Sequence, residues 1–245
     1  MAEGLLLLHA WPVDARMWEP QRSALPGALL VAAPSLPGFG GTAGVGPVTS
    51  MAACAEGAVV ALDEAEIDRA VVCGLSMGGY VAFELWRRAR HRISGLVLAN
   101  TRAVPDTPEG VETRRALAAR LRAEGNVLVD EPPPLLSDDA PEGLRRRVRA
   151  WIADQRAEAI AAAALGLAER PDSTPDLPGI DVPTLVITSS GDRLIPPDVS
   201  IAMGQAIPGA RTEVLEGAGH LSNLEAPEAF AALLREHLAT CGLPA

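Results

Sequence analysis

Short runs of apolar residues alternate along this chain with segments in which apolar residues recur at helical spacing. Six runs have the length of buried strands: 4–8, 28–33, 69–73, 93–99, 184–188 and 212–215. Amphipathic helices are predicted between them, near 50–66, 79–90, 198–206 and 226–238. This alternation is typical of an α/β fold in which a mostly parallel sheet carries helices on both faces. We therefore expect functional side chains in loops at the carboxyl ends of the strands.

The alternation stops between about residues 102 and 178. This stretch has no strand-like run, and Leu144, Val148, Trp151 and Ile152 share one face of a predicted helix. It is too long for a loop, and proline clusters divide it. We expect 1–101 and 179–245 to form the α/β core, and 102–178 to form a small all-helical cap (a lid) over the functional site. An independent helical domain is less favoured, because the sheet resumes directly at Val182.

Composition narrows the possible partners. The 245 residues, 48% of them hydrophobic, suit one globular domain, and the net charge of −10 disfavours nucleic acid as a partner. Three cysteines are too few for a disulfide framework. The apolar run 5–8 is too short for a signal peptide, and no run has the length of a membrane span. We expect a cytoplasmic protein that acts on a small molecule, with no membrane partner.

The segment 74–78 has the pattern G-x-S-x-G, with Ser76 at its centre. A strand is predicted directly before it and a helix directly after it, which is the arrangement of a nucleophile elbow. The tight turn lifts the serine hydroxyl out of the sheet, and the small glycines let the strand and helix approach each other. The alternative is a strand–helix turn whose serine only caps the helix.

A serine nucleophile needs a base. Of four histidines, His91 and His237 lie at the ends of amphipathic helices and are expected to be solvated, while His9 follows the first strand. His220 lies in a loop of small residues between the last strand and the last helix, so it is the predicted base. A loop histidine with a structural role is the alternative.

The base in turn needs an orienting acid. Asp192 follows the strand 184–188, and the chain order Ser76, Asp192, His220 is that of an α/β-hydrolase triad. A turn residue is the alternative for Asp192. Asn100 is not a carboxylate, and Asp198 is expected in the first turn of the following helix.

Donors for a developing oxyanion are expected from two backbone N–H groups. One belongs to Met77, which follows the nucleophile at a helix N-terminus. The second belongs to Trp11 in the loop after the first strand, because Pro12 has no N–H. We expect the ring of Trp11 to line the pocket, and a core tryptophan is the alternative.

Together these motifs resemble the α/β-hydrolase superfamily, in the branch of small bacterial carboxylesterases, enol-lactonases and cofactor-free haloperoxidase or perhydrolase relatives. The matching stretches are 8–12, 34–40, 74–79, 191–192 and 217–220. The resemblance implies that Ser76 is the nucleophile, His220 the base and Asp192 its partner. It also implies that Trp11 and Met77 form the oxyanion hole.

The chain departs from the family pattern at three places. Ala10 replaces the usual glycine after the histidine, which would reshape the oxyanion hole if that position requires a positive φ. Ser35 replaces the usual aspartate before Leu-Pro-Gly-Phe-Gly. The first strand starts almost at Met1, so the N-terminal hairpin of the family is expected to be missing.

The predicted function is that of a serine hydrolase that cleaves a small carboxylic ester or lactone through an acyl-enzyme. Two alternatives remain: perhydrolase or haloperoxidase-type activity on the same triad, and a ligand-binding receptor with this fold. No cofactor or metal is expected, because the chain has neither a dinucleotide fingerprint nor a metal-type histidine spacing.

Substrate-binding residues are expected on the cap and the oxyanion loop, namely Trp11, Leu135, Trp151 and Ile152. Only 3% of the residues are aromatic, which favours aliphatic pocket walls and compact substrate groups. Arg102 or Arg193 could meet a substrate carboxylate, although a solvated surface arginine is the simpler interpretation of both.

Overall fold

The fold is built on one parallel sheet. The computed structural model describes residues 1–41 and 50–245, and within these ranges six strands pair in the order β2-β1-β3-β4-β5-β6, all of them parallel. The strands are β1 (Glu3–Leu8), β2 (Leu30–Ala32), β3 (Arg69–Leu75), β4 (Ile93–Ala99), β5 (Thr184–Ser189) and β6 (Arg211–Leu215). The four central strands are almost wholly buried, which explains their continuous apolar sequences. The predicted α/β fold class is confirmed.

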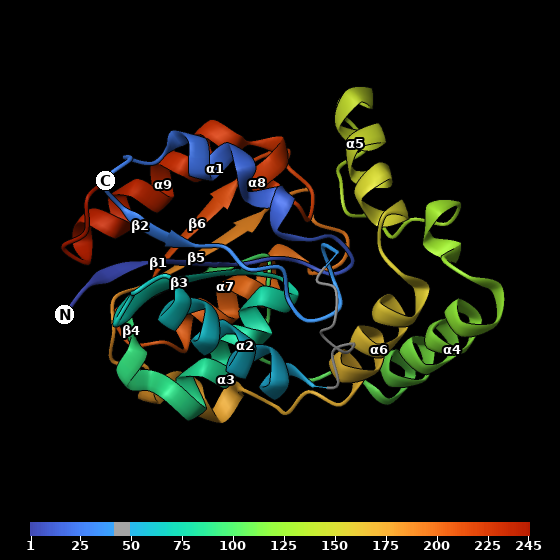
Figure 1. Cartoon of the computed structure of the whole chain (residues 1–245), viewed down its shortest axis with the longest axis horizontal. Helices are drawn as coiled ribbons and strands as arrows, with labels where there is room; N and C mark the ends of the chain where they lie inside the picture. Colours follow the sequence, from blue (N-terminus) through green and yellow to red (C-terminus); the bar gives the residue numbers. More distant parts are fainter. Residues whose placement is uncertain (42–49) are drawn as a thin grey trace.

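Helices cover both faces of this sheet. The helices outside the stretch 102–178 are α1 (Glu19–Ala24), α2 (Met51–Glu64), α3 (Met77–Ala89), α7 (Pro197–Gln205), α8 (Ser222–Glu225) and α9 (Pro227–Thr240). Short 3₁₀ turns occur at Ala15–Trp18, Arg90–Arg92, Val127–Val129 and Thr174–Gly179. Figure 1 shows α1 and α9 on one face and α2 and α3 on the other. The sequence did not predict α1 and α8, because helices of six and four residues are too short to display a period.

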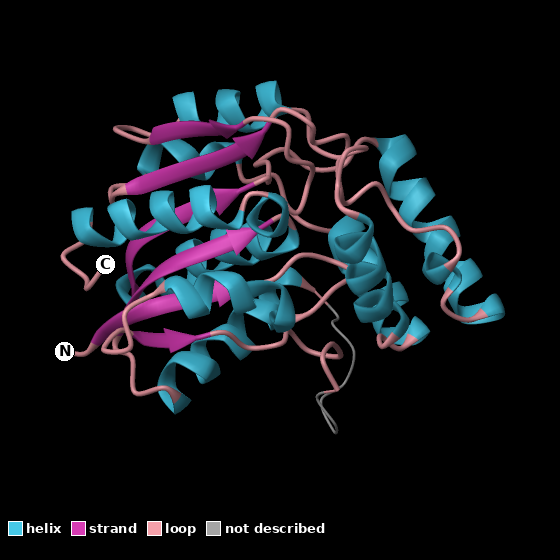
Figure 2. Cartoon of the chain, turned by 90° about the horizontal axis from the view of Figure 1, so that it is seen from above, coloured by secondary structure: helices cyan, strands magenta, loops and turns pink. Residues whose placement is uncertain are grey.

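The stretch 102–178, which we call the cap segment, contains α4 (Pro108–Glu124), α5 (Glu142–Ala153) and α6 (Ala157–Ala168). Its residues are all described, and none of them is in a strand. Figure 2 shows the strand arrowheads pointing toward these helices. The carboxyl ends of the strands therefore face the cap segment, and its treatment as a separate cap stays a prediction.

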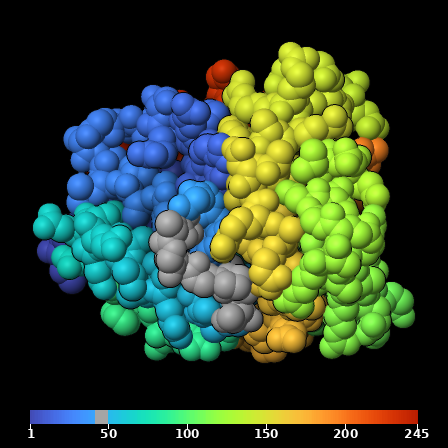
Figure 3. Space-filling model, turned by 45° about the vertical axis from the view of Figure 1, so that its right-hand side comes forward, coloured from blue at the N-terminus to red at the C-terminus, as the bar shows by residue number. Residues whose placement is uncertain are grey.

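Hydrogen bonds tie the cap segment to the core. The indole Nε1 of Trp11 donates to the carbonyl of Ile160 at 3.2 Å, and the side-chain amide of Gln155 donates to Asp14 at 2.7 Å. In Figure 3 the yellow surface of α5 and α6 lies against the blue surface of the N-terminal region. These contacts hold the cap segment over the loop that carries Trp11.

The described residues contain no helix with the length and apolar character needed to cross a bilayer.

Candidate active site

Ser76 alone separates β3 from α3. The structure extends the predicted strand by two residues and starts the helix two residues earlier, at Met77. Ser76 has φ 55° and ψ −111°, a conformation that costs a non-glycine residue about 1–3 kcal/mol. Its side chain is partly exposed although Leu75 and Met77 are buried. The strained turn therefore presents the hydroxyl at the end of the sheet.

Glycines permit this tight turn. A Cβ on Gly78 would overlap the backbone carbonyl of Leu8, and a Cβ on Gly74 would overlap the backbone of Gly78. The missing side chains let α3 begin directly beside β1 and β3. The sequence analysis expected these glycines to let the strand and the helix approach each other, which agrees with this packing.

The backbone of Ser76 is anchored to the neighbouring strand. Its N–H donates to the carbonyl of Ala99 at 2.9 Å, and its carbonyl accepts from the hydroxyl of Thr101 at 2.9 Å. Met77 is the first residue of α3, so its N–H has no acceptor inside the helix. An amide at this position can stabilise negative charge in front of the helix.

Asp192 and His220 form a buried pair. The Nδ1 atom of His220 lies 2.8 Å from Oδ2 of Asp192, and Oδ1 accepts from the N–H groups of Leu194 and Ile195 at 2.9 and 3.0 Å. Burial raises the pKa of the Asp192 carboxyl, but its hydrogen bonds and the charge of His220 outweigh this effect and hold the pKa below its usual value. An ionised carboxylate only accepts hydrogen bonds, so it places the histidine proton on Nδ1 and leaves Nε2 free.

Asn100 is a site residue that the sequence analysis missed. It was set aside because it is not a carboxylate, yet its amide nitrogen donates to Oδ2 of Asp192 at 2.9 Å. Its amide oxygen accepts from the hydroxyl of Ser222 at 2.6 Å, and the amide nitrogen also donates to Ser189 at 2.7 Å. Asn100 has φ 44° directly after β4, and its place at a strand end was the available signal.

Three of the predicted catalytic and oxyanion residues line one small cavity. Ser76, His220 and Trp11 line a cavity of about 110 Å³, and Met77 directly follows Ser76. Asp192 lies behind the histidine, bonded to its ring. The remaining lining residues are Tyr80, Arg102, Arg114, Pro133, Leu167, Leu194 and Ile195. Of these, the sequence analysis raised only Arg102, as a possible contact for a substrate carboxylate.

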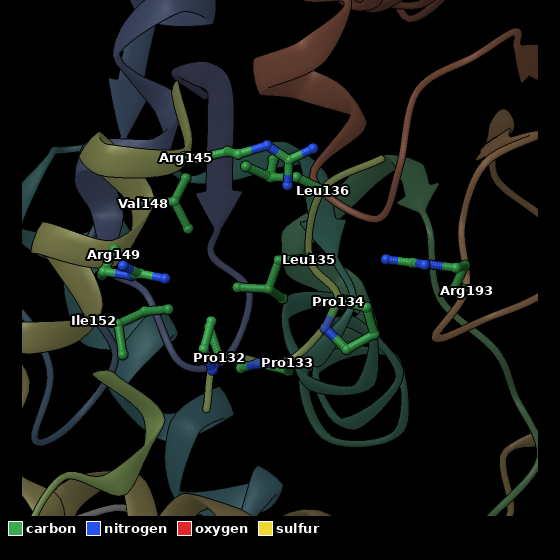
Figure 4. Close-up of a pocket in the computed structure, with 10 residues that line it drawn as sticks. All are labelled: Pro132, Pro133, Pro134, Leu135, Leu136, Arg145, Val148, Arg149, Ile152 and Arg193. Carbon is green, nitrogen blue, oxygen red and sulfur yellow. The ribbon is translucent and has the colours of Figure 1, made fainter. Parts of the chain in front are cut away.

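Two of the predicted substrate-binding residues line a second cavity. Leu135 and Ile152 border a space of about 250 Å³, and Figure 4 shows their side chains directed toward each other. Pro133 lines both this cavity and the one that holds Ser76. Trp151 is buried, and the guanidinium carbon of Arg16 lies 5.9 Å from its ring centroid. The role of these residues in binding substrate stays a prediction.

The other histidines lie outside this cavity. The expectation that His237 is solvated was wrong: it is 7% exposed, and burial lowers its pKa to about 4. Its helix face packs inward, where backbone groups of Leu96 and Pro183 bond the ring. His91 is exposed, as expected. His9 is fully buried, and burial lowers its pKa to about 4 as well.

Ala10 does not need the glycine backbone of the resembling family. Positive φ occurs at three described non-glycine residues, and Ala10 is not among them. Its N–H donates to the sulfur of Met17 at 3.2 Å, and this contact holds the loop that follows β1. Because the position does not require a positive φ, alanine causes no backbone strain there.

Residues 1–41 and 50–245 contain no cluster of histidine, cysteine and acidic side chains that could hold a metal ion.

Comparison with known proteins gives the same assignment of fold. The Alpha/beta hydrolase family matches residues 5–233. A pimeloyl-[acyl-carrier protein] methyl ester esterase of Aromatoleum aromaticum is 30% identical over 95% of this chain and 96% of its own. A 3-oxoadipate enol-lactonase of Acinetobacter baylyi is 29% identical over 94% of this chain and 86% of its own.

Solved structures of similar proteins have the same fold. A thermophilic esterase from Thermogutta terrifontis, described with malate bound, is 40% identical with a TM-score of 0.89, and covers 98% of this chain and 92% of that one. An enol-lactonase from Burkholderia xenovorans is 30% identical with a TM-score of 0.85 over the same shares. The sheet, the elbow and these relatives together establish that this chain belongs to the alpha/beta hydrolase family.

Proposed function

We propose that the protein is a serine hydrolase that cleaves a small carboxylic ester or lactone through an acyl-enzyme. The observation that carries the proposal is the convergence of Ser76 and His220 at one cavity, with Asp192 bonded to the far side of the imidazole. The class, an α/β-hydrolase acting on ester bonds, agrees with the esterase and enol-lactonase names of its relatives.

The first half of the reaction forms the acyl-enzyme. The Nε2 atom of His220 takes the proton of the Ser76 hydroxyl while the oxygen attacks the substrate carbonyl carbon. The N–H groups of Met77 and Trp11 stabilise the resulting oxyanion. When the intermediate collapses, the ester C–O bond breaks and His220 gives its proton to the leaving alcohol oxygen.

The second half releases the acid. A water molecule loses a proton to His220 and attacks the acyl carbon. When the new intermediate collapses, the C–O bond to serine breaks and His220 gives this proton to the Ser76 oxygen. Asp192 stays ionised throughout and stabilises the imidazolium, which its depressed pKa permits. In a lactone the leaving alcohol remains attached to the acyl group, and the same steps open the ring.

The cap segment supplies part of the proposed substrate site. Leu167 and Pro133 border the catalytic cavity, and Leu135 and Ile152 border the cavity on the other side of Pro133. We assign the acyl or alcohol chain to this second space. Trp151 does not line it, but precedes the lining residue Ile152 in α5. The lining of this space combines prolines and aliphatic side chains with three arginines, Arg145, Arg149 and Arg193, so an apolar chain would lie against the aliphatic part.

A panel of p-nitrophenyl esters of increasing acyl length, together with several lactones, tests the proposal. We expect multiple turnover of short esters by the wild-type protein, and at least a 10⁴-fold lower kcat for Ser76→Ala. Peracid formation from acetate and peroxide separates water from peroxide as the acceptor. Single-turnover behaviour with every ester would contradict an enzymatic role and favour a receptor.

A further inference from the structure

A cluster of three arginines around one carboxylate borders the catalytic cavity. Asp106, whose side chain is 3% exposed, pairs with Arg102, Arg114 and Arg170. Burial raises the pKa of Asp106, but the hydrogen bond from Arg170 and the charge of Arg114 outweigh it and hold the pKa well below its usual range. The carboxylate is therefore ionised, and the cluster holds two positive charges more than it holds negative ones.

Arg170 is the structural member of the cluster. Its side chain is 3% exposed, its terminal nitrogens donate to the carbonyls of Leu167 and Val104, and its guanidinium carbon lies 4.3 Å from the ring centroid of Tyr80. These contacts, with the bond to Asp106, use most of its donors. Arg170 does not line the cavity, so the positive charge at the cavity wall comes from the other two arginines.

Arg102 and Arg114 face the cavity. Both line the same space as Ser76 and His220, and their side chains are 25% and 23% exposed. Within the described part of the chain, each pairs with Asp106 and with no other acidic group. Arg102 donates to Asp106 through Nη2 and Arg114 through Nε, which leaves terminal nitrogens of both guanidinium groups without a partner among the described residues. A half-buried guanidinium with unused donors is costly unless an anion completes its bonds.

We infer that Arg102 and Arg114 form a carboxylate-binding subsite, so that the preferred substrate is a half-ester of a dicarboxylic acid or a lactone that carries a free carboxylate. The inference rests on the proposed function, because it places the anion on the molecule that Ser76 attacks. A planar carboxylate matches the paired N–H groups of a guanidinium, and neutral esters lack this partner. The position of the two arginines within the reaction cavity orients the scissile carbonyl toward the nucleophile.

A matched pair of substrates tests the subsite. The monomethyl esters of succinate, glutarate and adipate are compared with their monoamides, in which a neutral carboxamide of equal size replaces the carboxylate. For the best chain length we expect the acid to exceed the amide in kcat/KM by about 10-fold or more in the wild type, and the ratio to fall toward 1 in Arg102→Gln and Arg114→Gln. High salt should reduce the ratio. A wild-type ratio of 1 or less, or an unchanged ratio in both variants, would overturn the inference.

Two controls keep the result specific. Arg120 lies on the same helix as Arg114 but pairs with Glu131 at the surface. The variant Arg120→Gln should therefore retain the wild-type ratio of acid to amide. Arg114→Lys keeps the charge without the planar fork, and an intermediate ratio is expected. Thermal unfolding of each variant verifies that it is folded before kinetics are compared.

Binding without turnover provides an independent readout. In the Ser76→Ala background, glutarate should raise the melting temperature, and further replacement of Arg102 or Arg114 by glutamine should abolish the shift. Protection by inorganic phosphate and not by glutarate would overturn the carboxylate assignment. If the wild type hydrolyses p-nitrophenyl acetate but shows neither preference nor protection, only the subsite fails. If no ester of either kind is cleaved, the proposed function itself fails.

Discussion

Asparagine at position 192 would match aspartate in size but replace one acceptor oxygen by a donating NH₂ group. In the native site both oxygens accept. Oδ1 accepts from the N–H groups of Leu194 and Ile195, while Oδ2 accepts from the side-chain amide of Asn100 and pairs with Nδ1 of His220. The NH₂ group of an asparagine would therefore face donors in either orientation.

The consequence for catalysis follows from the tautomer. With NH₂ toward His220, the ring must accept at Nδ1 and carry its proton on Nε2, where it can no longer take the proton of Ser76. We expect kcat to fall about 10⁴-fold, equivalent to about 5 kcal/mol of transition-state stabilisation. The lost charged hydrogen bonds should lower the free energy of unfolding by about 1.5–3 kcal/mol, which leaves most domains folded.

Steady-state hydrolysis of p-nitrophenyl acetate by Asp192→Asn measures this loss, with urea denaturation to record the stability. Asp198→Asn is the matched control, because Asp198 is an exposed residue in the first turn of α7 and should keep wild-type kcat. If Asp192→Asn retained more than about a tenth of wild-type activity in folded protein, the imidazole would be oriented by another group and the reasoning would be refuted.

Three further perturbations test the packing, the core charge and the cap. Gly78→Ala places a Cβ against a backbone carbonyl of β1 and should lower the free energy of unfolding by about 1–3 kcal/mol. Gly143 has open space around it, so the control Gly143→Ala should be neutral or stabilising. Equal losses in the two variants would contradict the tight elbow. The pKa of His9 is about 4 in the folded protein and 6.5 in the unfolded chain. Between pH 6.5 and pH 4 the unfolded state therefore binds more protons, so the free energy of unfolding falls as the pH drops. Between pH 7 and pH 5, His9 accounts for a loss of about 2 kcal/mol in the free energy of unfolding. Urea denaturation at the two pH values should therefore show a smaller loss of stability in His9→Gln than in the wild type. Trp151→Ala should shift the acyl-length preference by about 10-fold; an unchanged profile in both Trp151→Ala and Leu135→Ala would refute the assigned pocket wall.

The fold was predictable because its four central strands are buried on both faces. Continuous apolar runs such as those of β3 and β4 are clear in a sequence, and the short α1 and α8 are not. The catalytic candidates were also accessible, since glycines around Ser76 and small residues before His220 mark special backbone geometry locally.

The arginine cluster and the support of the acid were not predictable in this way. Asn100 acts on Asp192, which is 92 positions away, and Arg170 pairs with Asp106 at a separation of 64. Only the folded chain brings such pairs together. His237 illustrates the reverse error, because its place near the end of an amphipathic helix suggested solvent and the helix packs that face inward.

Covalent labelling of the nucleophile tests the central claim most directly. The protein is treated with a fluorophosphonate, and intact mass and peptide mapping locate the adduct. We predict one adduct, on the peptide that contains Ser76, with none in Ser76→Ala and normal labelling in the exposed-serine control Ser23→Ala. Labelling should be strongly slowed in His220→Ala, because the base is missing. An adduct on a different serine, or undiminished labelling of Ser76→Ala, would contradict the account.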